Sequence, residues 1–357
     1  VYEEPARYDT TLNAFFDHGT QVLDRETVEV LAEHDLTSDQ LASFLAQAEA
    51  RCLGDGRTPP DPMGARSLLQ FLAHYGATHP SRYRLLRGFI TRASRAAPSL
   101  ELREAAADSR WQLEVGFRNW LGPPSRIAVD PETGLEYRWD DVVAFSDEID
   151  ENARATLLKA IARTTLLREA VFLFSGGAVV RLDDILPQGV WVRLLGSDHG
   201  KSVYRVAVKT RDGGQYDMAV NLNVDLPAGA MDEEINWLIV CGEERDRAPL
   251  VELFGGQWPD YGLWTEEFIP GETLDHALDR LERRSRDDGW YESIWPFAAW
   301  SALGAYADFW DRTGRRLVID DPTPANVIVP MHDYHAGSRL VSISARRPFI
   351  SMVDMLQ

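Results

Sequence analysis

The sequence predicts an α+β fold in which a mainly helical N-terminal domain precedes a second domain made of an antiparallel sheet and helices. Apolar residues recur three and four positions apart through most of residues 11–120, which is typical of packed helices. After Gly176 the period changes to two, and tight turns separate the apolar runs, which predicts consecutive strands. Strands followed by helices, instead of alternating with them, indicate α+β and not a parallel α/β sheet.

The N-terminal domain is expected to span residues 1–146. Residues 35–48 have a helical apolar period after a capping Thr37 or Ser38. Residues 51–62 contain two Gly and three Pro and predict a loop, and residues 65–97 resume the helical period with an interruption near 76–80. The domain is therefore expected to consist of helices packed on one another.

A small β element closes this domain near residues 126–145, where two short apolar runs flank an Asp-Pro-Glu-Thr-Gly turn. This pattern predicts a hairpin. Residues 147–169 predict one long helix, because the apolar positions Leu157, Ile161 and Leu166 share a face. We assign residues 147–181 to this connecting helix and a linker.

The second domain is expected to span residues 182–357 and to contain five antiparallel strands, with one helix after the third strand. The predicted strands are 190–195, 202–209, 216–223, 250–254 and 263–268. The predicted helices are 232–241 and 297–312. The strand order along the chain places a turn containing two glycines between the first two strands.

Composition excludes several classes of function. The 357 residues are 45% hydrophobic, enough for two folded domains, and no run approaches the roughly 18 apolar residues of a membrane helix. The net charge of -19 repels phosphate backbones and anionic lipid surfaces, so neither nucleic acid nor a membrane is an expected partner. Cys52 and Cys241 are far apart and predict buried free thiols. We expect a cytoplasmic protein.

The turn between the first two predicted strands has the chemistry of a phosphate-binding loop. Gly196 and Gly200 lie within Leu-Gly-Ser-Asp-His-Gly-Lys, residues 195–201. A backbone without Cβ atoms can approach phosphates closely and direct its N–H groups toward them.

With the features that follow it, this loop resembles the protein-kinase-like superfamily, including its aminoglycoside-phosphotransferase and choline-kinase-like branches. The resemblance covers about residues 182–357 and implies a five-stranded antiparallel N-lobe sheet with a helical C-lobe, which is expected to be short. Gly196 and Gly200 resemble the glycine loop that covers the nucleotide, and Glu234 resembles the helix-C glutamate. Residues 266–274 resemble the hinge, which implies nucleotide contacts at Glu266 and Phe268.

The resemblance also supplies a catalytic loop and a metal site. Asp321 and Asn326 are five residues apart in Asp-Pro-Thr-Pro-Ala-Asn and resemble the catalytic-loop pair, and Asp354 resembles the metal-binding Asp after the next apolar run. In phosphoryl transfer a carboxylate orients the acceptor hydroxyl, while an amide oxygen and a second carboxylate hold Mg²⁺. The implied roles are acceptor orientation for Asp321 and Mg²⁺ binding for Asn326 and Asp354.

The chain departs from the family pattern where the phosphate-binding lysine belongs. Asn221 occupies that position on the third strand, and an amide does not supply the charge of an ammonium group. Lys201 in the glycine loop and Lys209 at the end of the second strand are the candidate replacements. Lys201 is the better one, since it resembles the glycine-loop lysine of the with-no-lysine kinases. Two further departures are Asp198 at the second glycine and Ile319 where a His is usual.

The resemblance implies an enzyme: an ATP- and Mg²⁺-dependent phosphotransferase acting on a hydroxyl of a small molecule or a protein. The alternative from another class is a pseudokinase, a binding or scaffold module without chemistry, which the three departures favour. A third alternative keeps the fold and the metal site, but the nucleotide binds in the inverted orientation. A nucleotidyl group is then transferred instead of a phosphate. The N-terminal helical domain is a candidate surface for a protein partner.

Overall fold

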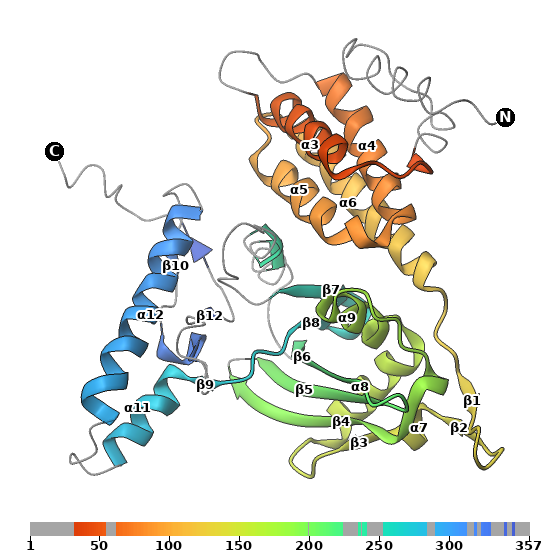
Figure 1. The fold of residues 1–357 in the computed structure, drawn as a ribbon, viewed down its shortest axis with the longest axis vertical. Coiled ribbons are helices and arrows are strands. Elements are labelled where there is room, and N and C mark those ends of the chain that lie inside the picture. The colour runs from red at the N-terminus through yellow and green to blue at the C-terminus, as the bar shows by residue number, and fades with distance from the viewer. Residues whose placement is uncertain are drawn as a thin grey trace. The chain divides into compact units, whose positions relative to one another are not determined.

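The computed structural model describes residues 32–54, 62–198, 200–223, 235–236, 238–240, 253–283, 290–312, 318–319, 323–329, 339–340 and 345–346. The chain divides into two compact units, Val1–Gly122 and Pro123–Gln357 (Figure 1). Within the described residues, no helix combines the length and apolar character needed to cross a membrane.

The first unit is helical, as predicted. Its described elements are α3 (Ser38–Leu53), α4 (Pro62–Thr78), a 3-10 turn at Pro80–Arg82, α5 (Tyr83–Ala96) and α6 (Leu100–Leu121). Thr37 begins α3 with a capping box: its hydroxyl accepts from the N–H of Gln40 at 3.3 Å, and the Gln40 side chain accepts from the Thr37 N–H at 2.9 Å. The reciprocal bonds satisfy two of the free N–H groups at the helix start.

Aromatic packing fills the centre of this unit. The rings of Tyr83 on α5 and Phe117 on α6 are stacked with centroids 3.9 Å apart, and both side chains are fully buried. Cys52 is a buried free thiol, as predicted, and burial followed by the nearby Glu49 charge raises its pKa to about 12. Such a thiol is unreactive at neutral pH. Cys241 lies outside the described residues.

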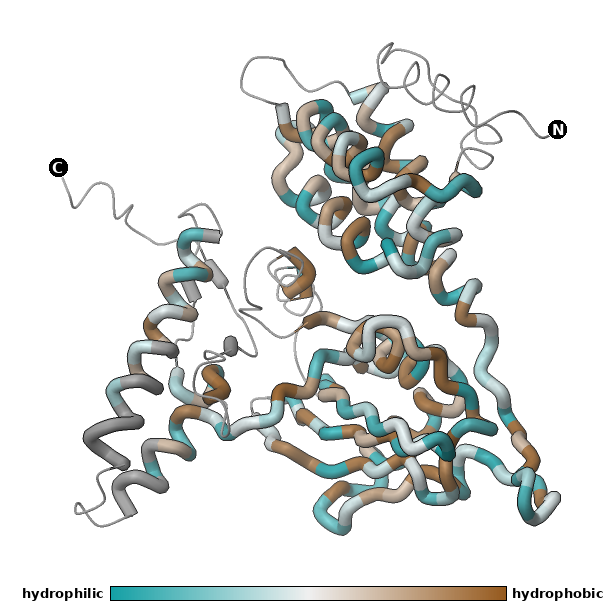
Figure 2. Tube along the Cα trace, in the orientation of Figure 1, coloured by the Kyte–Doolittle hydropathy of each residue, from teal (hydrophilic) through white to brown (hydrophobic). Residues whose placement is uncertain are grey.

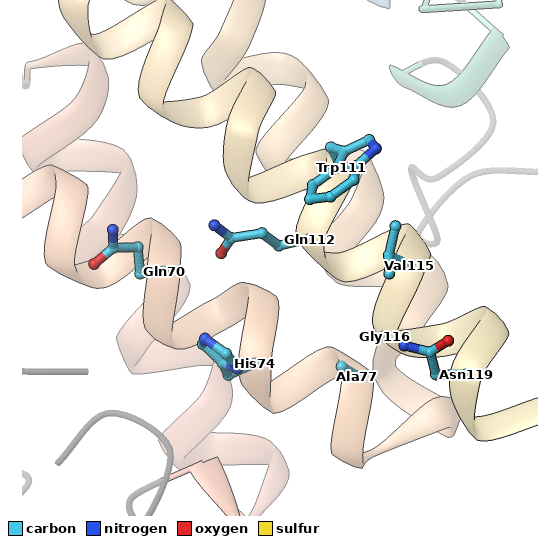
Figure 3. A pocket seen from close by; sticks show the side chains of 8 residues that line it. All are labelled: Gln70, His74, Ala77, Trp111, Gln112, Val115, Gly116 and Asn119. Atoms are coloured by element: carbon cyan, nitrogen blue, oxygen red, sulfur yellow. The ribbon is translucent and has the colours of Figure 1, made fainter. Parts of the chain in front are cut away.

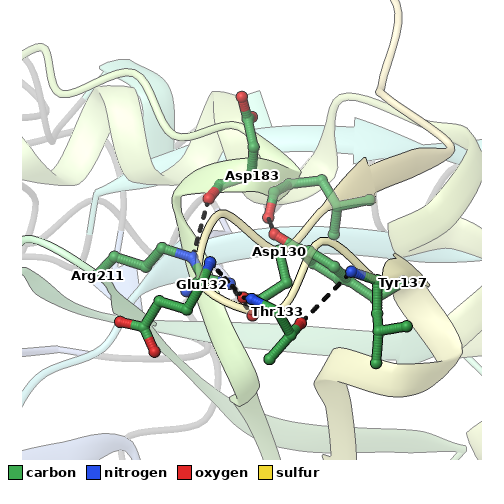
Figure 4. Close-up of polar contacts among 8 residues, drawn as sticks. Asp130, Glu132, Thr133, Tyr137, Asp183 and Arg211 are labelled. Carbon is green, nitrogen blue, oxygen red and sulfur yellow. Dashed lines mark hydrogen bonds and ion pairs between the residues drawn. The ribbon is translucent and has the colours of Figure 1, made fainter.

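The predicted hairpin is present as β1 (Ile127–Val129) paired with β2 (Glu136–Arg138), and it lies within the second unit. Asp130 organises its turn by accepting from the N–H groups of Glu132 and Thr133 and from the Arg211 guanidinium at 2.9 Å (Figure 4). These contacts, with the Thr133 N–H first, lower the pKa of Asp130 to about 2. Arg211 belongs to the turn between two sheet strands, so the contact fastens the hairpin to the sheet.

The prediction of one long helix over residues 147–169 is wrong. Two helices are present, α8 (Glu151–Arg163) and α9 (Leu166–Ser175). The Thr164 hydroxyl donates to the Ala160 carbonyl at 2.7 Å and accepts from the Leu166 N–H at 3.2 Å. By bonding to the backbone on both sides, this side chain ends one helix and starts the next.

The second unit contains a six-stranded sheet in the order β3-β4-β5-β6-β8-β7. Its strands are β3 (Val143–Phe145), β4 (Ile185–Asp198), β5 (Lys201–Thr210), β6 (Gln215–Asn223), β7 (Phe254–Trp258) and β8 (Leu263–Glu267). Five antiparallel strands were predicted, but β3 adds a sixth that runs parallel to β4. A strand of three residues is too short to show a period of two, so the pattern did not reveal it.

Hydropathy changes from residue to residue along the strands of the sheet (Figure 2). Because successive side chains of a strand point to opposite sides, the sheet has two chemically different faces. We call one the core face: Val190, Val192, Tyr204, Val206, Val208, Met218 and Val220 pack there with apolar residues of α8 and α9. We call the other the polar face. It contains Arg193, Lys201, Val203, Arg205, Lys209, Asn221, Trp264 and Glu266, placed together by strand register.

After the sheet come β9 (Glu272–Thr273), α11 (Leu274–Arg283), α12 (Trp290–Arg312), β10 (Val318–Ile319), a 3-10 turn at Pro324–Asn326, β11 (Val327–Val329), β12 (Arg339–Leu340) and β13 (Ala345–Arg346). Two small antiparallel sheets form, in the orders β12-β11-β9 and β10-β13. The observed class is therefore α+β, with a helical first unit and a mixed sheet in the second.

Candidate functional site

The glycine turn joins β4 to β5 at one end of the sheet. Gly200 has a φ of +87°, a left-handed conformation that favours glycine. Gly196 has no such requirement, and a Cβ added there would meet no atom of the described residues within 4 Å. Since neither its backbone nor its packing demands a glycine, Gly196 leaves open space beside the backbone where a ligand can approach.

Lys201 begins β5 on the polar face. Its ammonium nitrogen lies 5.3 Å from the centroid of the Trp264 ring on β8. Lys209 is on the same face of the same strand, exposed, eight residues further along. At about 3.4 Å per residue the two Cα atoms are roughly 27 Å apart, so the two lysines cannot contact one phosphate group together.

A buried hydrogen-bonded cluster lies beside Lys201. The Asn221 amide nitrogen donates to one carboxylate oxygen of Glu266 at 2.8 Å, and the Trp264 indole N–H donates to the other at 2.5 Å. Asn221 and Trp264 are direct partners across β6 and β8, which explains why their side chains meet on one face. All three are at most 2% exposed.

This cluster is rich in acceptors. Glu266 holds a buried carboxylate with two neutral donors, and the Asn221 amide oxygen is buried without a hydrogen-bond partner in the described part of the chain. A buried acceptor left without a donor costs about 1–3 kcal/mol. The two buried acceptors therefore favour a hydrogen-bond donor or a positive charge nearby. Lys201 brings a positive charge to this cluster, because its ammonium group lies over the ring of Trp264.

The exposed half of the polar face is cationic. Arg193 and Arg205 are direct partners across β4 and β5, so two like charges lie side by side. Arg205 is compensated by an ion pair with Asp217 at 2.9 Å and lies 4.6 Å from the centroid of the Phe268 ring. With Lys201 and Lys209 these residues make a strip with four cationic side chains on a chain of net charge -19, partly offset by Asp217 and by Asp198, the strand partner of Lys201. Such a strip attracts anions.

The segment predicted as a hinge pairs with the strand that follows Asn326. Thr273 and Glu272 of β9 are partners of Ile328 and Val329 of β11. The turn that ends at Asn326 contacts α11 and β9. The structure thus brings the predicted hinge and the end of the predicted catalytic loop into one small sheet.

Of the sequence-predicted site residues, Lys201 and Glu266 meet through Trp264, Phe268 contacts Arg205, and Gly196 and Gly200 frame the turn before Lys201. Asp321, Asp354 and Glu234 lie outside the described residues. Among the residues that are described, no group of three or more His, Cys, Asp or Glu side chains is arranged to hold a metal ion.

Sequence reasoning missed the Asn221–Glu266–Trp264 cluster. One signal was available: Trp264 and Glu266 are two residues apart on a strand and therefore share a face. The sequence could not show that Asn221 lies opposite Trp264, because register between strands 40 residues apart depends on tertiary structure.

Fold and site together define an α+β unit whose glycine turn and positive strip suit an anionic ligand. Neither a protein-family model nor a curated protein sequence matches this chain. Function must therefore be argued from the site itself.

Proposed function

We propose that this protein is an ATP- and Mg²⁺-dependent phosphotransferase acting on a hydroxyl of a small molecule or a protein, with Lys201 as the residue that contacts the nucleotide phosphates. The observation that carries the proposal is the glycine turn followed directly by Lys201, which lies over Trp264 beside the buried Asn221–Glu266 pair.

The turn supports phosphate binding through its backbone. At Gly196 a ligand can approach to a distance that a side chain would block, since no atom in the described part of the chain lies within 4 Å of the place of a Cβ. Backbone N–H groups of such a turn donate to phosphate oxygens without side-chain charge. The neighbouring half-buried Val203 and exposed Leu195 offer an apolar surface for a nucleotide base.

The charge argument favours Lys201 over the other candidates. Asn221 is neutral, and its amide is already bonded to Glu266, so it is a positioning residue at most. Lys209 lies roughly 27 Å along β5. Lys201 begins β5 directly after the turn and is paired with Asn223, two residues from Asn221.

The remaining roles rest on the resemblance. Asp321 would orient the acceptor hydroxyl, and Asn326 with Asp354 would hold Mg²⁺, which takes carboxylate and amide oxygens. The ion would neutralise charge on the nucleotide phosphates. Glu234 would supply the helix carboxylate, and Phe268 and Glu266 the hinge side of the nucleotide site.

One observation favours a second candidate, a nucleotide-binding scaffold without phosphoryl transfer. Asn221 is 1% exposed and bonded to Glu266, so a neutral amide with a hydrogen-bond partner occupies the position where the resemblance implies a lysine. A scaffold would bind the nucleotide through the turn and Lys201 but yield no phosphorylated product.

Titration calorimetry with ATP, with and without Mg²⁺, tests the proposal on four proteins: the unaltered chain, Lys201→Ala, Lys209→Ala and Asp354→Ala. We expect Mg²⁺-dependent binding that weakens about tenfold or more in Lys201→Ala, in line with loss of a charged hydrogen bond of about 1.5–3 kcal/mol. Asp354→Ala should lose the Mg²⁺ dependence, and Lys209→Ala should bind as the unaltered chain does.

Absence of ATP binding would contradict both candidates. Binding without transfer distinguishes them: mass spectrometry of hydroxyl-containing candidate acceptors incubated with Mg²⁺ and ATP would show added phosphate for the enzyme and no change for the scaffold.

A further inference from the structure

A groove of about 410 Å³ lies between α4 and α6 in the helical first unit (Figure 3). Its volume falls within the range of small-ligand sites, about 300–1,000 Å³. Its rim and walls include Gln70, His74, Trp111, Gln112, Val115 and Asn119.

The floor of the groove is fixed by close helix packing. A Cβ at Gly116 on α6 would come within 2.4 Å of the Ala77 Cβ on α4, so the two helices touch backbone to side chain there. Leu113 and Phe117 of the same helix are fully buried in the helical core, and Leu113 packs against Gly76 of α4. The groove is therefore a preformed feature of two packed helices.

The lining is polar but uncharged. None of its eight residues is Asp, Glu, Lys or Arg, although 26% of the chain is charged. Gln70, Gln112 and Asn119 each offer an amide that both donates and accepts, and His74 adds an imidazole. Groups of this kind match a neutral ligand with many hydrogen-bonding groups.

Trp111 adds an aromatic surface at the same place. Its side chain is 65% exposed, whereas Leu113 and Phe117 of the same helix are buried. An indole left in water forgoes the free energy of burying a large apolar area. The flat face of the ring is available to pack against the C–H surface of a sugar ring.

We propose that this groove binds a short neutral saccharide, with Trp111 packing on a sugar ring and the side-chain amides bonding to its hydroxyls. A peptide fits less well, because the groove offers only Ala77 and Val115 as aliphatic contacts and no apolar pocket for an anchoring side chain. The inference goes beyond the proposed phosphotransferase and does not depend on it.

Saturation-transfer NMR on the full chain tests the proposal, with maltose, cellobiose, lactose and diacetylchitobiose as probes at concentrations up to about 10 mM. At least one disaccharide should receive saturation. Trp111→Ala should weaken its binding about tenfold, as loss of an aromatic contact does, and Asn119→Ala about fivefold, as loss of one hydrogen bond does.

Trp120→Ala is the matched control: it removes another exposed indole, 46% exposed, from the same helix outside the groove, and should leave binding unchanged. Because Trp111 and Asn119 are exposed, their variants should unfold at the same temperature as the unaltered chain. The proposal is overturned if no disaccharide binds, if a neutral Gly-Ser tetrapeptide binds more tightly than every sugar, or if Trp111→Ala and Trp120→Ala behave alike.

Discussion

The two faces of the six-stranded sheet are made by the same strands but differ in burial and in chemistry. On β5, Tyr204, Val206 and Val208 point to the core face and are buried against α8 and α9, while the residues between them point to the polar face. On the polar face of β5, charged side chains occur at every fourth residue from Lys201, at Lys201, Arg205 and Lys209, with Val203 and Ala207 between them. Because adjacent residues of one strand lie in the core and on the polar face separately, substitutions on the two faces should have separable effects.

The polar face is itself divided. On β6 and β8 it is buried, with Asn221 and Glu266 bonded to each other, whereas on β4 and β5 Trp191 is 50% exposed and Arg193 lies in water. The buried half is held by the hydrogen bonds of Glu266, and the exposed half by strand pairing and by the Arg205–Asp217 ion pair. In the proposed nucleotide site, the buried cluster would support the site and the exposed strip would meet the ligand.

The largest expected effect separates the two faces directly. Met218→Ala, on the core face and fully buried, should lower the free energy of unfolding by about 2–5 kcal/mol, because it leaves a cavity. Lys209→Ala, on the polar face, should change it by less than about 0.5 kcal/mol. Urea denaturation of both variants measures the change in the free energy of unfolding. Equal losses would show that the two faces contribute equally to stability, contrary to this account.

A second substitution tests the buried half of the polar face. Asn221→Asp replaces the amide donor with a carboxylate against Glu266, and should cost about 2–4 kcal/mol at pH 7. Repulsion raises the folded-state pKa of this carboxylate pair above its unfolded value, so the loss should be full at neutral pH and shrink as the pH falls toward about 4.

Asn223→Asp is the control, on the same strand and face but half-buried, with a smaller expected loss. Urea denaturation at pH 7 and pH 4.5 would measure both variants. A loss for Asn221→Asp that does not shrink at the lower pH would contradict the charge-repulsion account.

The smallest effect is expected away from both faces, where the hairpin is fastened to the sheet by Asp130 and Arg211. The folded-state pKa of Asp130 is about 2, below its ordinary value of 3.8. A depressed pKa contributes stability that is complete above about pH 4 and is lost as the pH falls toward 2. Asp130→Asn should remove this contribution.

Denaturation at pH 6 and pH 2.5 would show the unaltered chain more stable than Asp130→Asn at the higher pH, with this stability gap more than halved at the lower. Glu132→Gln, in the same turn, is the control. A stability gap that stays constant between the two pH values would argue against an ionised Asp130 in this role.

Much of this fold could be predicted from the sequence, because its signals are local. The strands near 190–195, 202–209 and 216–223 alternate apolar and polar residues, and Thr37 precedes a helix with the residues of a capping box. The break at Thr164 and the edge strand β3 could not be predicted, since one depends on which backbone groups a hydroxyl reaches and the other on pairing with a distant strand.

The site was predictable only in part, for the same reason. Gly196 and Lys201 are recognisable from the turn they form, and Asn221 from its place in the third predicted strand. The partnership of Asn221 with Glu266, and the distance between Lys201 and Lys209, follow from register and strand length. Those properties belong to the folded sheet and not to any short segment.

The most direct test of the central claim, that Lys201 meets the nucleotide phosphates on the polar face, is labelling with an acyl-phosphate derivative of ATP. A lysine amine next to the bound phosphates attacks the acyl carbon, forms an amide and releases ATP, and peptide mass spectrometry identifies the lysine. We expect acylation of Lys201 that excess ATP with Mg²⁺ suppresses, and no ATP-sensitive labelling of Lys209. Equal labelling of both lysines, or labelling of Lys201 that ATP does not suppress, would contradict the account.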